Sequence, residues 1–469
     1  MKKLVGIAGI VSLLAACGSN GPSPGNQTQL AKSTASYSVL CSTSLTTDIL
    51  KELGGYGKVS KEFYEINAVT MNLTDVDAAA VGALPYVDSV APIAERKGSP
   101  VDTVNVDNYL GGIRTWDLDA IEVSDHGPNY PLGTRTVSYD GTGVYVAVLD
   151  TGLMDSWRQY FPEQRIATGY AKAYAGGGME HGAVTEVPNK WEHDVNGHGT
   201  HVTSTIIGYS LYGTPVDGVA PMATIIPVKV LNQNGSGWSS MVTAGILYVA
   251  ELKAGPLANS PVVINMSLGG PGPDPLERRA IDHAIAQGVI VVAAAGNEGK
   301  LGMGDPAAYA PVISAAAYGW LGEWQPPGNS AWWYNLGMSE PTNPGQFYIT
   351  DFSSRSLGPH QDLDVAAPGS WVVGPYQLQQ GKISYYFLGG TSMASPHVAG
   401  VVALMAEKNP GLTAAQAEQI IEDSAIPMAA PGNLCVYTGP SGKVGCYSWD
   451  VDATGSGMLD AAAALNMTP

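Results

Sequence analysis

Residues 144–152 read VYVAVLDTG, an unbroken apolar run that ends in Asp-Thr-Gly. Short runs of this kind are typical of parallel strands that are buried on both faces. Further apolar runs occupy residues 224–230, 262–266, 289–295 and 312–316. Segments with helical character lie between or after them, at residues 241–252, 393–407 and 413–423. This alternation predicts an α/β fold with a doubly wound parallel sheet and helices on both faces.

Polar residues stand at the ends of three of these runs. Asp150, Ser267 and Asn297 each come at or just after the last apolar residue. In open parallel sheets, functional sites form outside the carboxyl ends of the strands. The sequence therefore predicts that these three side chains gather at one edge of the sheet.

Two glycine-rich segments complete a candidate catalytic set. Residues 196–202 read NGHGTHV, and residues 389–400 read GGTSMASPHVAG. Asp150, His198 and Ser392 then follow one of the known chain orders for a serine-nucleophile triad.

The segment around Ser392 also predicts its own local structure. The preceding glycines allow a tight turn, and Pro396 is expected within the first turn of a helix, where its missing N–H is not needed. Ser392 should then lie at a helix N-terminus, where the backbone N–H and the helix dipole favour a nearby oxyanion.

These segments resemble the subtilisin-like serine peptidases, or subtilases, and the resemblance extends over roughly residues 115–465. It implies that Ser392 is the nucleophile, that His198 is the general base and that Asp150 orients His198. It also implies that the Asn297 side chain donates to the oxyanion, and that peptide bonds are cleaved through an acyl-enzyme.

The same resemblance identifies candidate substrate-binding residues. Two segments resemble the extended strands that flank a subtilase cleft and bind the peptide through main-chain hydrogen bonds, which predicts broad specificity. A pocket that accepts a large apolar side chain before the scissile bond is also implied, with Gly304 at its floor. The cleft segments are Gly235, Ser236, Gly237 and Ser267, Leu268, Gly269, and the pocket adds Ala294, Ala295 and Gly296 to Leu268.

Two other functions remain open from the sequence. His193, His198 and His201 cluster beside Asp194, which would suit a metal-dependent hydrolase. A catalytically silent surface binding protein that keeps the fold is the other alternative. His201 and His397 are interpreted as packing or hydrogen-bonding residues.

No cofactor is expected for the chemistry, although calcium is a candidate for stability and its ligands are not assigned. Residues 209–216 lack the Asn-rich sequence that carries the strong calcium site in many subtilases. Acidic loops elsewhere remain candidates for weaker binding.

The composition restricts the partners of this chain. It has 469 residues, with 45% hydrophobic and 14% charged residues, and its formal net charge is −18. Because phosphate binding needs clustered Lys and Arg, this charge argues against nucleic acid as a partner. Protein or peptide substrates and the chain's own propeptide are the expected partners of a monomer.

The N-terminus predicts export. Lys2 and Lys3 precede an apolar run at 4–16 that is too short for a transmembrane helix. The following Cys17 resembles the lipidated residue of a bacterial lipoprotein signal; an ordinary secretory signal is the alternative. We expect a cell-envelope lipoprotein precursor whose only membrane contact is a lipid on Cys17, and an extracellular or periplasmic mature enzyme.

The remaining chain divides by composition and pattern. Residues 36–97 predict a small α+β domain, with strands at 37–40, 63–71 and 87–93 and helices at 47–53 and 75–84; its position resembles the inhibitory propeptide of subtilases. The predicted organisation is a signal at 1–17, a flexible linker at 18–35, the propeptide at 36–97, a processing linker at 98–114 and the peptidase domain at 115–469. The chain is therefore expected to process itself from a zymogen.

Two further features are open to a structural interpretation. Cys435 and Cys446 lie close together in the sequence and fit a hairpin disulfide, while Cys41 is expected to be a small buried residue. The aromatic insertion at 320–348 is either a hydrophobic cluster under a long loop or a wall of the cleft.

Overall fold

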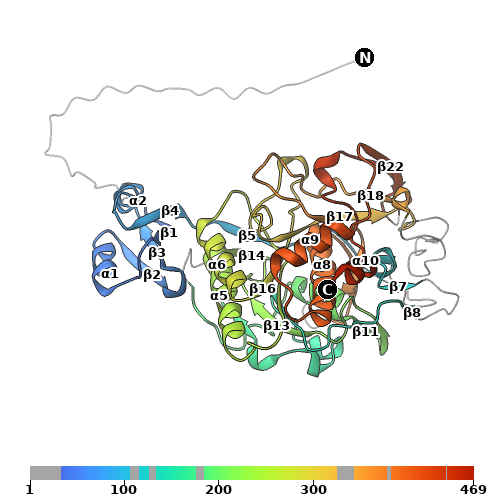
Figure 1. The fold of residues 1–469 in the computed structure, drawn as a ribbon, viewed down its shortest axis with the longest axis horizontal. Coiled ribbons are helices and arrows are strands. Elements are labelled where there is room, and N and C mark those ends of the chain that lie inside the picture. Colours follow the sequence, from blue (N-terminus) through green and yellow to red (C-terminus); the bar gives the residue numbers. More distant parts are fainter. Residues whose placement is uncertain are drawn as a thin grey trace, which may run out of the picture. The chain divides into compact units, whose positions relative to one another are not determined.

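The computed structural model describes most of the chain (Figure 1). The described residues are 33–105, 116–125, 134–175, 184–324, 343–377, 382–439 and 441–469. One compact unit, Thr34–Pro469, contains nearly all of them. The predicted signal segment and most of the linker at 18–35 lie outside the described residues.

A mainly parallel sheet forms the centre of this unit. Its order is β10-β13-β9-β15-β16-β17-β18, and β19 also pairs with β17. Neighbouring strands are parallel except for the antiparallel pair β17–β18. The strands are β9 (Tyr145–Asp150), β10 (Lys172–Ala173), β13 (Thr224–Lys229), β15 (Val262–Met266), β16 (Val289–Ala294), β17 (Ile313–Trp320), β18 (Phe347–Ile349) and β19 (Val365–Pro368). The predicted fold class is confirmed, with one antiparallel strand added.

Helices cover both faces of this sheet. Figure 1 shows α5 and α6 on one side and α8, α9 and α10 on the other, and α4 packs against α8. The helices are α4 (His198–Ile207), α5 (Ser239–Ala254), α6 (Pro275–Ala286), α8 (Thr391–Lys408), α9 (Ala414–Ser424) and α10 (Ala461–Met467). Local signals fix some helix starts: Asp274 caps α6 ahead of Pro275, and Thr413 and Gln416 form a capping box at α9.

The strand order creates a switch point at β9. The chain runs from β9 through α4 to β13 on one side of β9, and then through α5 to β15 on its other side. Crevices form where the order reverses in this way. The carboxyl end of β9 is Asp150, so the predicted site lies where the topology favours one.

Residues 35–92 form a small α+β layer, as predicted. The sheet order is β2-β3-β1-β4, with all pairs antiparallel. Its elements are β1 (Ala35–Cys41), α1 (Thr47–Gly54), β2 (Lys58–Phe63), β3 (Ala68–Leu73), α2 (Asp75–Gly82) and β4 (Val87–Pro92). Val39, Leu53 and Met71 belong to its own buried cluster.

The prediction of one strand over residues 63–71 is wrong. The chain ends β2 at Phe63, makes a single 3-10 turn and passes through Asn67 at φ 50° before β3 starts. Ile66 and Ala68 are two residues apart and are both buried in the main core, so their burial imitates the alternation of one strand.

Short strands and one short helix complete the described architecture. They are β5 (Glu95–Lys97), β6 (Asp102–Asn105), α3 (Trp116–Ala120), β7 (Ser124–Asp125), β8 (Thr134–Arg135), β11 (Tyr209–Leu211), β12 (Thr214–Val216), β14 (Ser236–Trp238), β20 (Val372–Pro375), β21 (Tyr385–Gly389), β22 (Gly432–Tyr437) and β23 (Val444–Trp449). In the described parts of the chain, the helices lack the length and apolar character needed to cross a membrane.

The cysteine predictions are consistent with the structure. Cys435 and Cys446 face each other across β22 and β23 and form a disulfide. Cys41 is a free thiol and is buried in the small domain.

The described part of the aromatic insertion belongs to the core. Trp320 and Trp324 are buried, and Trp324 packs edge-on against Trp371 and Phe387. This favours the hydrophobic-cluster interpretation for these two residues. The other predicted aromatic residues, Trp332, Trp333 and Tyr334, lie outside the described residues.

Candidate active site

Asp150 and His198 form a buried pair. Asp150 is the last residue of β9, and His198 is the first residue of α4. The His198 Nδ1 atom lies 2.8 Å from Asp150 Oδ1 and 3.0 Å from Oδ2, and both side chains are 0% exposed. A Cβ atom at residue 199 would collide with the carbonyl oxygen of Gly152, so glycine is needed for this close approach.

A second carboxylate, Asp194, supports the Asp150–His198 pair. The sequence had suggested Asp194 only as a neighbour of the histidine cluster. Its Oδ2 atom accepts from Thr151 Oγ1 at 2.8 Å and from Gly197 N at 2.9 Å. The same Thr151 oxygen accepts from Gly199 N at 2.9 Å. Burial raises the pKa of Asp194 to about 6, although the nearby Lys229 ammonium opposes this shift. This network joins the turn after β9 to the start of α4.

Ser392 lies beside this pair, at the second residue of α8. Its Oγ atom donates to Ser267 O at 3.2 Å, and His198 Nε2 is buried without a hydrogen-bond partner among the described residues. A Cβ atom built on Gly98 would lie 2.7 Å from Ser267 O and 3.4 Å from His198 Cε1. The imidazole and the oxygen to which Ser392 donates therefore border the same small space.

The position expected for Pro396 is wrong. The residue lies in the second turn of α8, not in the first. Proline at this position removes the hydrogen bond that would reach the carbonyl four residues earlier, at Ser392. That carbonyl instead accepts from Ser267 Oγ at 2.8 Å, so a residue from the end of β15 replaces the missing helical donor.

Two N–H donors converge in front of Ser392. The amide oxygen of Asn297 accepts from Thr391 N at 2.9 Å and from Thr391 Oγ1 at 3.0 Å, which fixes the amide orientation. A Cβ atom built on Gly390 would lie 3.7 Å from both Asn297 Nδ2 and Ser392 N. Both nitrogen atoms therefore lie close to one point, as the donors of an oxyanion site must.

The predicted cleft segments already bind a peptide, which is residues 95–98 of the chain itself. β5 pairs antiparallel with β14, so Arg96 faces Gly237 in the ladder. Lys97 and Gly269 exchange two backbone hydrogen bonds of 2.9 Å, and Gly98 N donates to Gly235 O at 2.9 Å. Gly235, Ser236, Gly237 and Gly269 thus lie together, as predicted.

The chain that follows residues 95–98 forms further backbone hydrogen bonds on the other side of the catalytic groups. Val101 N donates to Gly389 O at 2.6 Å, and β6 then pairs antiparallel with β21, which leads to Ser392. A Cβ atom built on Gly98 would lie 3.4 Å from His198 Cε1, and Val101 is bonded to Gly389, so residues 99 and 100 cross the catalytic groups between these two contacts.

The predicted pocket residues lie at neighbouring strand ends. β15 and β16 are adjacent and parallel, which brings Leu268 close to Ala294, Ala295 and Gly296. Gly304 packs against Gly270, whose carbonyl oxygen leaves no room for a Cβ atom at residue 304.

The histidine cluster is not a metal site in the structure. His193 Nδ1 lies 2.9 Å from Asp155 on the surface, while the buried His201 Nε2 lies 3.1 Å from Val372 O. Burial lowers the pKa of His201 to about 3. Among the described residues, the carboxylates of Asp362, Asp364 and Glu418 are the group whose ligand atoms lie close enough for a metal, within 4.8 Å.

His397 is a structural residue, as interpreted from the sequence. Its Nδ1 atom lies 2.8 Å from Met393 O and its Nε2 atom lies 3.0 Å from Asp117. It therefore joins α8 to α3.

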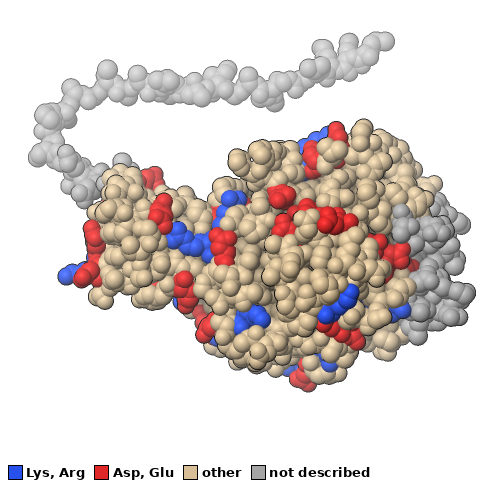
Figure 2. Space-filling model, in the orientation of Figure 1, with Lys and Arg blue, Asp and Glu red and all other residues tan. Residues whose placement is uncertain are grey.

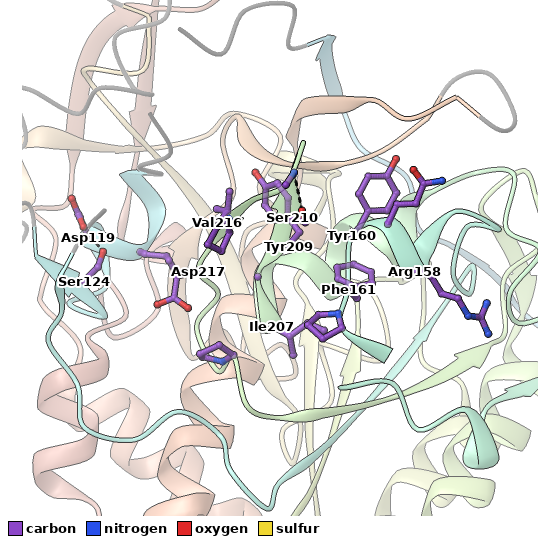
Figure 3. Close-up of a pocket in the computed structure, with 17 residues that line it drawn as sticks. Asp119, Ser124, Arg158, Tyr160, Phe161, Ile207, Tyr209, Ser210, Val216 and Asp217 are labelled. Carbon is purple, nitrogen blue, oxygen red and sulfur yellow. Dashed lines mark hydrogen bonds between the residues drawn. The ribbon is translucent and has the colours of Figure 1, made fainter. Parts of the chain in front are cut away.

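A cavity of about 700 Å³ lies apart from these residues. Figure 3 shows Asp119 and Ser124 at one end of it, Arg158 at the other, and Tyr160 and Tyr209 between them. The cavity shares no lining residue with the catalytic set. Residues 95–101 pair with the segments on both sides of the cleft.

The negative net charge of the sequence is visible on the surface of the molecule. Figure 2 shows acidic side chains spread over the visible face, with few basic ones among them. The visible face offers no extended basic surface for a polyanion.

Comparisons with known proteins agree with this geometry. A family model described as the Subtilase family, peptidase S8, matches residues 141–458. Subtilisin E from Bacillus subtilis (strain 168) is 32% identical over 82% of this chain and 81% of its own length. An extracellular serine proteinase from Thermus sp. (strain Rt41A) is 32% identical over 69% of this chain and 66% of its own length.

Solved structures show the same fold. Fervidolysin from Fervidobacterium pennivorans, a keratinolytic enzyme related to subtilisin, aligns with a TM-score of 0.63 over 95% of this chain and 63% of that chain. Its 24% identity supports the fold alone. Sphericase aligns with a TM-score of 0.53 and 27% identity over 74% of this chain and 97% of that chain.

An α/β fold with a buried Asp–His pair beside a helix-terminal serine defines the class of serine hydrolases with a catalytic triad. The chain belongs to the subtilase family. It is a subtilisin-like serine endopeptidase that acts on protein substrates. This conclusion replaces the metal-hydrolase and silent-binding alternatives.

Proposed function

We propose that Ser392, His198, Asp150 and Asn297 carry out the peptidase reaction. The observation that carries this assignment is the buried 2.8 Å contact between His198 Nδ1 and Asp150, next to Ser392 at the start of α8. The Asn297 amide and the Ser392 N–H face a common point, where the oxyanion would form.

The reaction then follows from these positions. Ser392 Oγ attacks the scissile carbonyl carbon while His198 Nε2 takes the hydroxyl proton, and Asp150 stabilises the imidazolium without becoming protonated. The carbon–nitrogen bond breaks, and the amine leaves with the proton from His198. Water then attacks the acyl-enzyme, gives a proton to His198 and releases the acid and Ser392.

Substrate peptides bind as an added strand between the two cleft segments. Main-chain hydrogen bonds to Gly235 and Gly269 supply most of this binding, which favours broad specificity. The pocket formed by Leu268, Ala294, Ala295, Gly296 and Gly304 takes a large apolar side chain before the scissile bond.

The chain is a zymogen that processes itself. Residues 36–97 form the inhibitory domain, and the processing linker at 98–114 crosses the cleft where a substrate would bind. Support comes from the pairing of β5 with β14 and of β6 with β21, which fills both sides of the cleft.

Cleavage of the propeptide also determines where the peptidase domain is found. A lipid on Cys17 lies on the propeptide side of any cut in residues 98–114, so the cut releases the peptidase domain from the membrane. A Ser392→Ala chain should stay membrane-associated at full length, while the wild type yields a shorter soluble form. Equal membrane association of both chains after loss of the propeptide would contradict this model.

Calcium stabilises the fold and takes no part in the chemistry. Asp364 Oδ1 is buried and has no hydrogen-bond partner among the described residues, and it belongs to the acidic group with Asp362 and Glu418. Carboxylate oxygens are the ligands that calcium prefers. This group lies in the loop before β19 and on α9, away from Ser392.

The decisive experiment is labelling with a fluorophosphonate probe, followed by peptide mapping and intact mass. We expect a label on Ser392 and the loss of roughly the first hundred residues. Ser392→Ala should give neither result. A folded peptidase domain that stays unlabelled after trace protease has removed the propeptide would overturn the assignment.

A further inference from the structure

A charged side chain from the cleft-bound segment is completely buried in the enzyme. The Arg96 guanidinium donates from Nη2 to Glu277 Oε2 at 2.7 Å and from Nε to the same oxygen at 3.0 Å. Both side chains are 0% exposed. A buried arginine is costly unless its charge is matched, so this subsite is built for a cation.

The backbone register assigns this subsite to one substrate position. Lys97 pairs with Gly269 and Gly98 pairs with Gly235, so the segment lies as a substrate strand. With the Ser99–Pro100 bond at the catalytic groups, Arg96 is the fourth residue before that bond. Its neighbour Lys97 is 66% exposed, so the burial is specific to the Arg96 position.

The surroundings of Glu277 carry excess negative charge. Asp274 is buried at the start of α6, and one of its oxygens has no hydrogen-bond partner among the described residues. Asp305 is also buried and is neutralised by Arg278 through contacts of 2.7 and 2.8 Å. With Arg96 present, three carboxylates therefore face two guanidinium groups. When Arg96 leaves, one guanidinium remains.

Glycine makes space for the guanidinium. A Cβ atom at Gly270 would lie 3.0 Å from Arg96 Nη1 and would collide with the carbonyl oxygen of Glu95. Nη1 also donates to that carbonyl at 3.2 Å, so the planar group is held on two sides.

We propose that the enzyme selects substrates with arginine at the fourth position before the scissile bond, and that Glu277 recognises this side chain. The selection rests on the proposed function, because it needs the catalytic groups and the cleft register described above. Lysine should be accepted less well, because an ammonium group lacks the rigid, planar pair of N–H donors that Arg96 directs at Glu277 Oε2.

The test compares four chromogenic tetrapeptides, acetyl-Xaa-Ala-Gly-Phe-p-nitroanilide, with Xaa as Arg, Lys, Gln or Leu. The chromogenic bond fixes the register, and the mature enzyme is prepared from the full chain. We expect kcat/KM for the Arg peptide to exceed that for the Gln peptide by about tenfold or more, because a neutral side chain leaves Glu277 unpaired.

Substitutions at Glu277 test whether this side chain causes the preference for the Arg peptide. Glu277→Gln should bring the ratio of Arg to Gln peptides close to one, and Glu277→Leu should favour the Leu peptide. Glu251→Gln, an exposed change on α5, should keep the wild-type ratio. Equal rates for all four peptides on the wild type would overturn the inference and leave the peptidase function intact. If the wild type neither hydrolyses any of the peptides nor reacts with the probe, both the arginine selectivity and the proposed peptidase assignment are overturned.

The pH dependence gives a readout that needs no variant. Burial raises the pKa of Glu277 to about 7, against the effect of Arg96; Asp274 and Asp305 also raise it. The remaining charge that faces this group is Arg278, which pairs with Asp305. The Arg-to-Gln ratio should therefore be larger at pH 9 than at pH 6. A pH effect on the catalytic step acts on both peptides equally and cancels in the ratio, so an unchanged ratio would count against Glu277.

Discussion

The carbonyl oxygen of Ser392 depends on a donor from outside its own helix. Pro396 cannot supply the N–H that normally bonds four residues back, and Ser267 Oγ takes its place at 2.8 Å. The same hydroxyl group lies 2.8 Å from Ser395 Oγ and accepts from Asn265 Nδ2 at 3.0 Å. One hydroxyl therefore satisfies several buried polar groups directly behind the nucleophile.

Ser267→Ala should leave the Ser392 carbonyl and the Asn265 amide without this partner. Leaving buried polar groups unsatisfied costs about 1–3 kcal/mol, so the free energy of unfolding should fall by about that amount. Denaturant unfolding in a Ser392→Ala background measures it without self-digestion. Ser267→Thr, which keeps the hydroxyl group, is the matched control and should recover most of the loss. Equal stability of the Ala and Thr variants would rule out this role.

Residue-scale prediction from sequence is most specific where a motif carries the chemistry. Asp150, His198, Ser392 and Asn297 lie within short segments whose glycines and strand ends constrain them. Asp194 and Glu277 could not be found in this way. Glu277 meets Arg96 across 181 residues, and Asp194 stands in a sequence that fits a metal ligand equally well.

At the scale of elements, α6 shows how one helix serves several partners. Glu277 holds Arg96, Arg278 holds Asp305, and Arg279 reaches the small domain through Asp88 at 2.9 Å and Cys41 O at 2.9 Å. Consecutive residues on a helix point in different directions, which makes this division possible. The helix therefore connects the substrate subsite to the domain that precedes it.

β5 and β6 could not be predicted from the sequence for a related reason. Residues 95–105 are mostly polar and show no alternation of buried and exposed positions. Their strand structure comes from pairing with β14 and β21, which are far away in the chain. Non-local pairing of this kind overrides local propensity.

The segment between these strands places a resistant bond at the nucleophile. The nitrogen of Pro100 is part of a ring, so the ring carbon crowds the imidazole that must protonate the leaving nitrogen. Wild-type protein should therefore be cut at Ser99–Pro100 only slowly, and its self-processing should mainly use another bond within residues 98–114. Pro100→Ala should be cut there about tenfold faster or more, because reaction rates depend steeply on such geometry.

Intact mass and N-terminal mapping over a time course measure this cut directly. The Pro100→Ala, Ser392→Ala double variant is the control and should remain whole. Identical rates of cutting between residues 99 and 100 in the wild type and in Pro100→Ala would show that proline does not protect the bond.

For the whole molecule, the acidic group of Asp362, Asp364 and Glu418 links stability to pH and calcium. Burial and the nearby carboxylates together raise the pKa values of Asp364 and Glu418 to about 7, although hydrogen bonds from Ser314 oppose the shift at Asp364. A carboxyl group with a raised pKa in the folded state binds protons more tightly when folded. Without metal, its contribution to stability is therefore lost as pH rises from about 4 to about 7.

Calcium should replace these protons. We expect calcium to raise the melting temperature of the Ser392→Ala chain by a few degrees at pH 8 relative to chelator, and by less at pH 5, where protons compete for the same oxygens. The stabilisation is about 2.7 kcal/mol when calcium is at a hundred times its dissociation constant. Thermal unfolding followed by circular dichroism measures the melting temperature with calcium and with chelator at each pH.

Glu418→Gln tests whether the calcium-dependent rise in melting temperature comes from binding at this group or from a general effect of ionic strength. It should remove the calcium-dependent shift and raise the melting temperature in chelator at pH 8, because one half-buried negative charge beside Asp364 has gone. Asp423→Asn, an exposed change on the same helix, should keep the calcium response. If Glu418→Gln responds to calcium as the wild type does, calcium acts at another place in the molecule. A response that is as large at pH 5 as at pH 8 would show that the buried carboxylates are not its ligands.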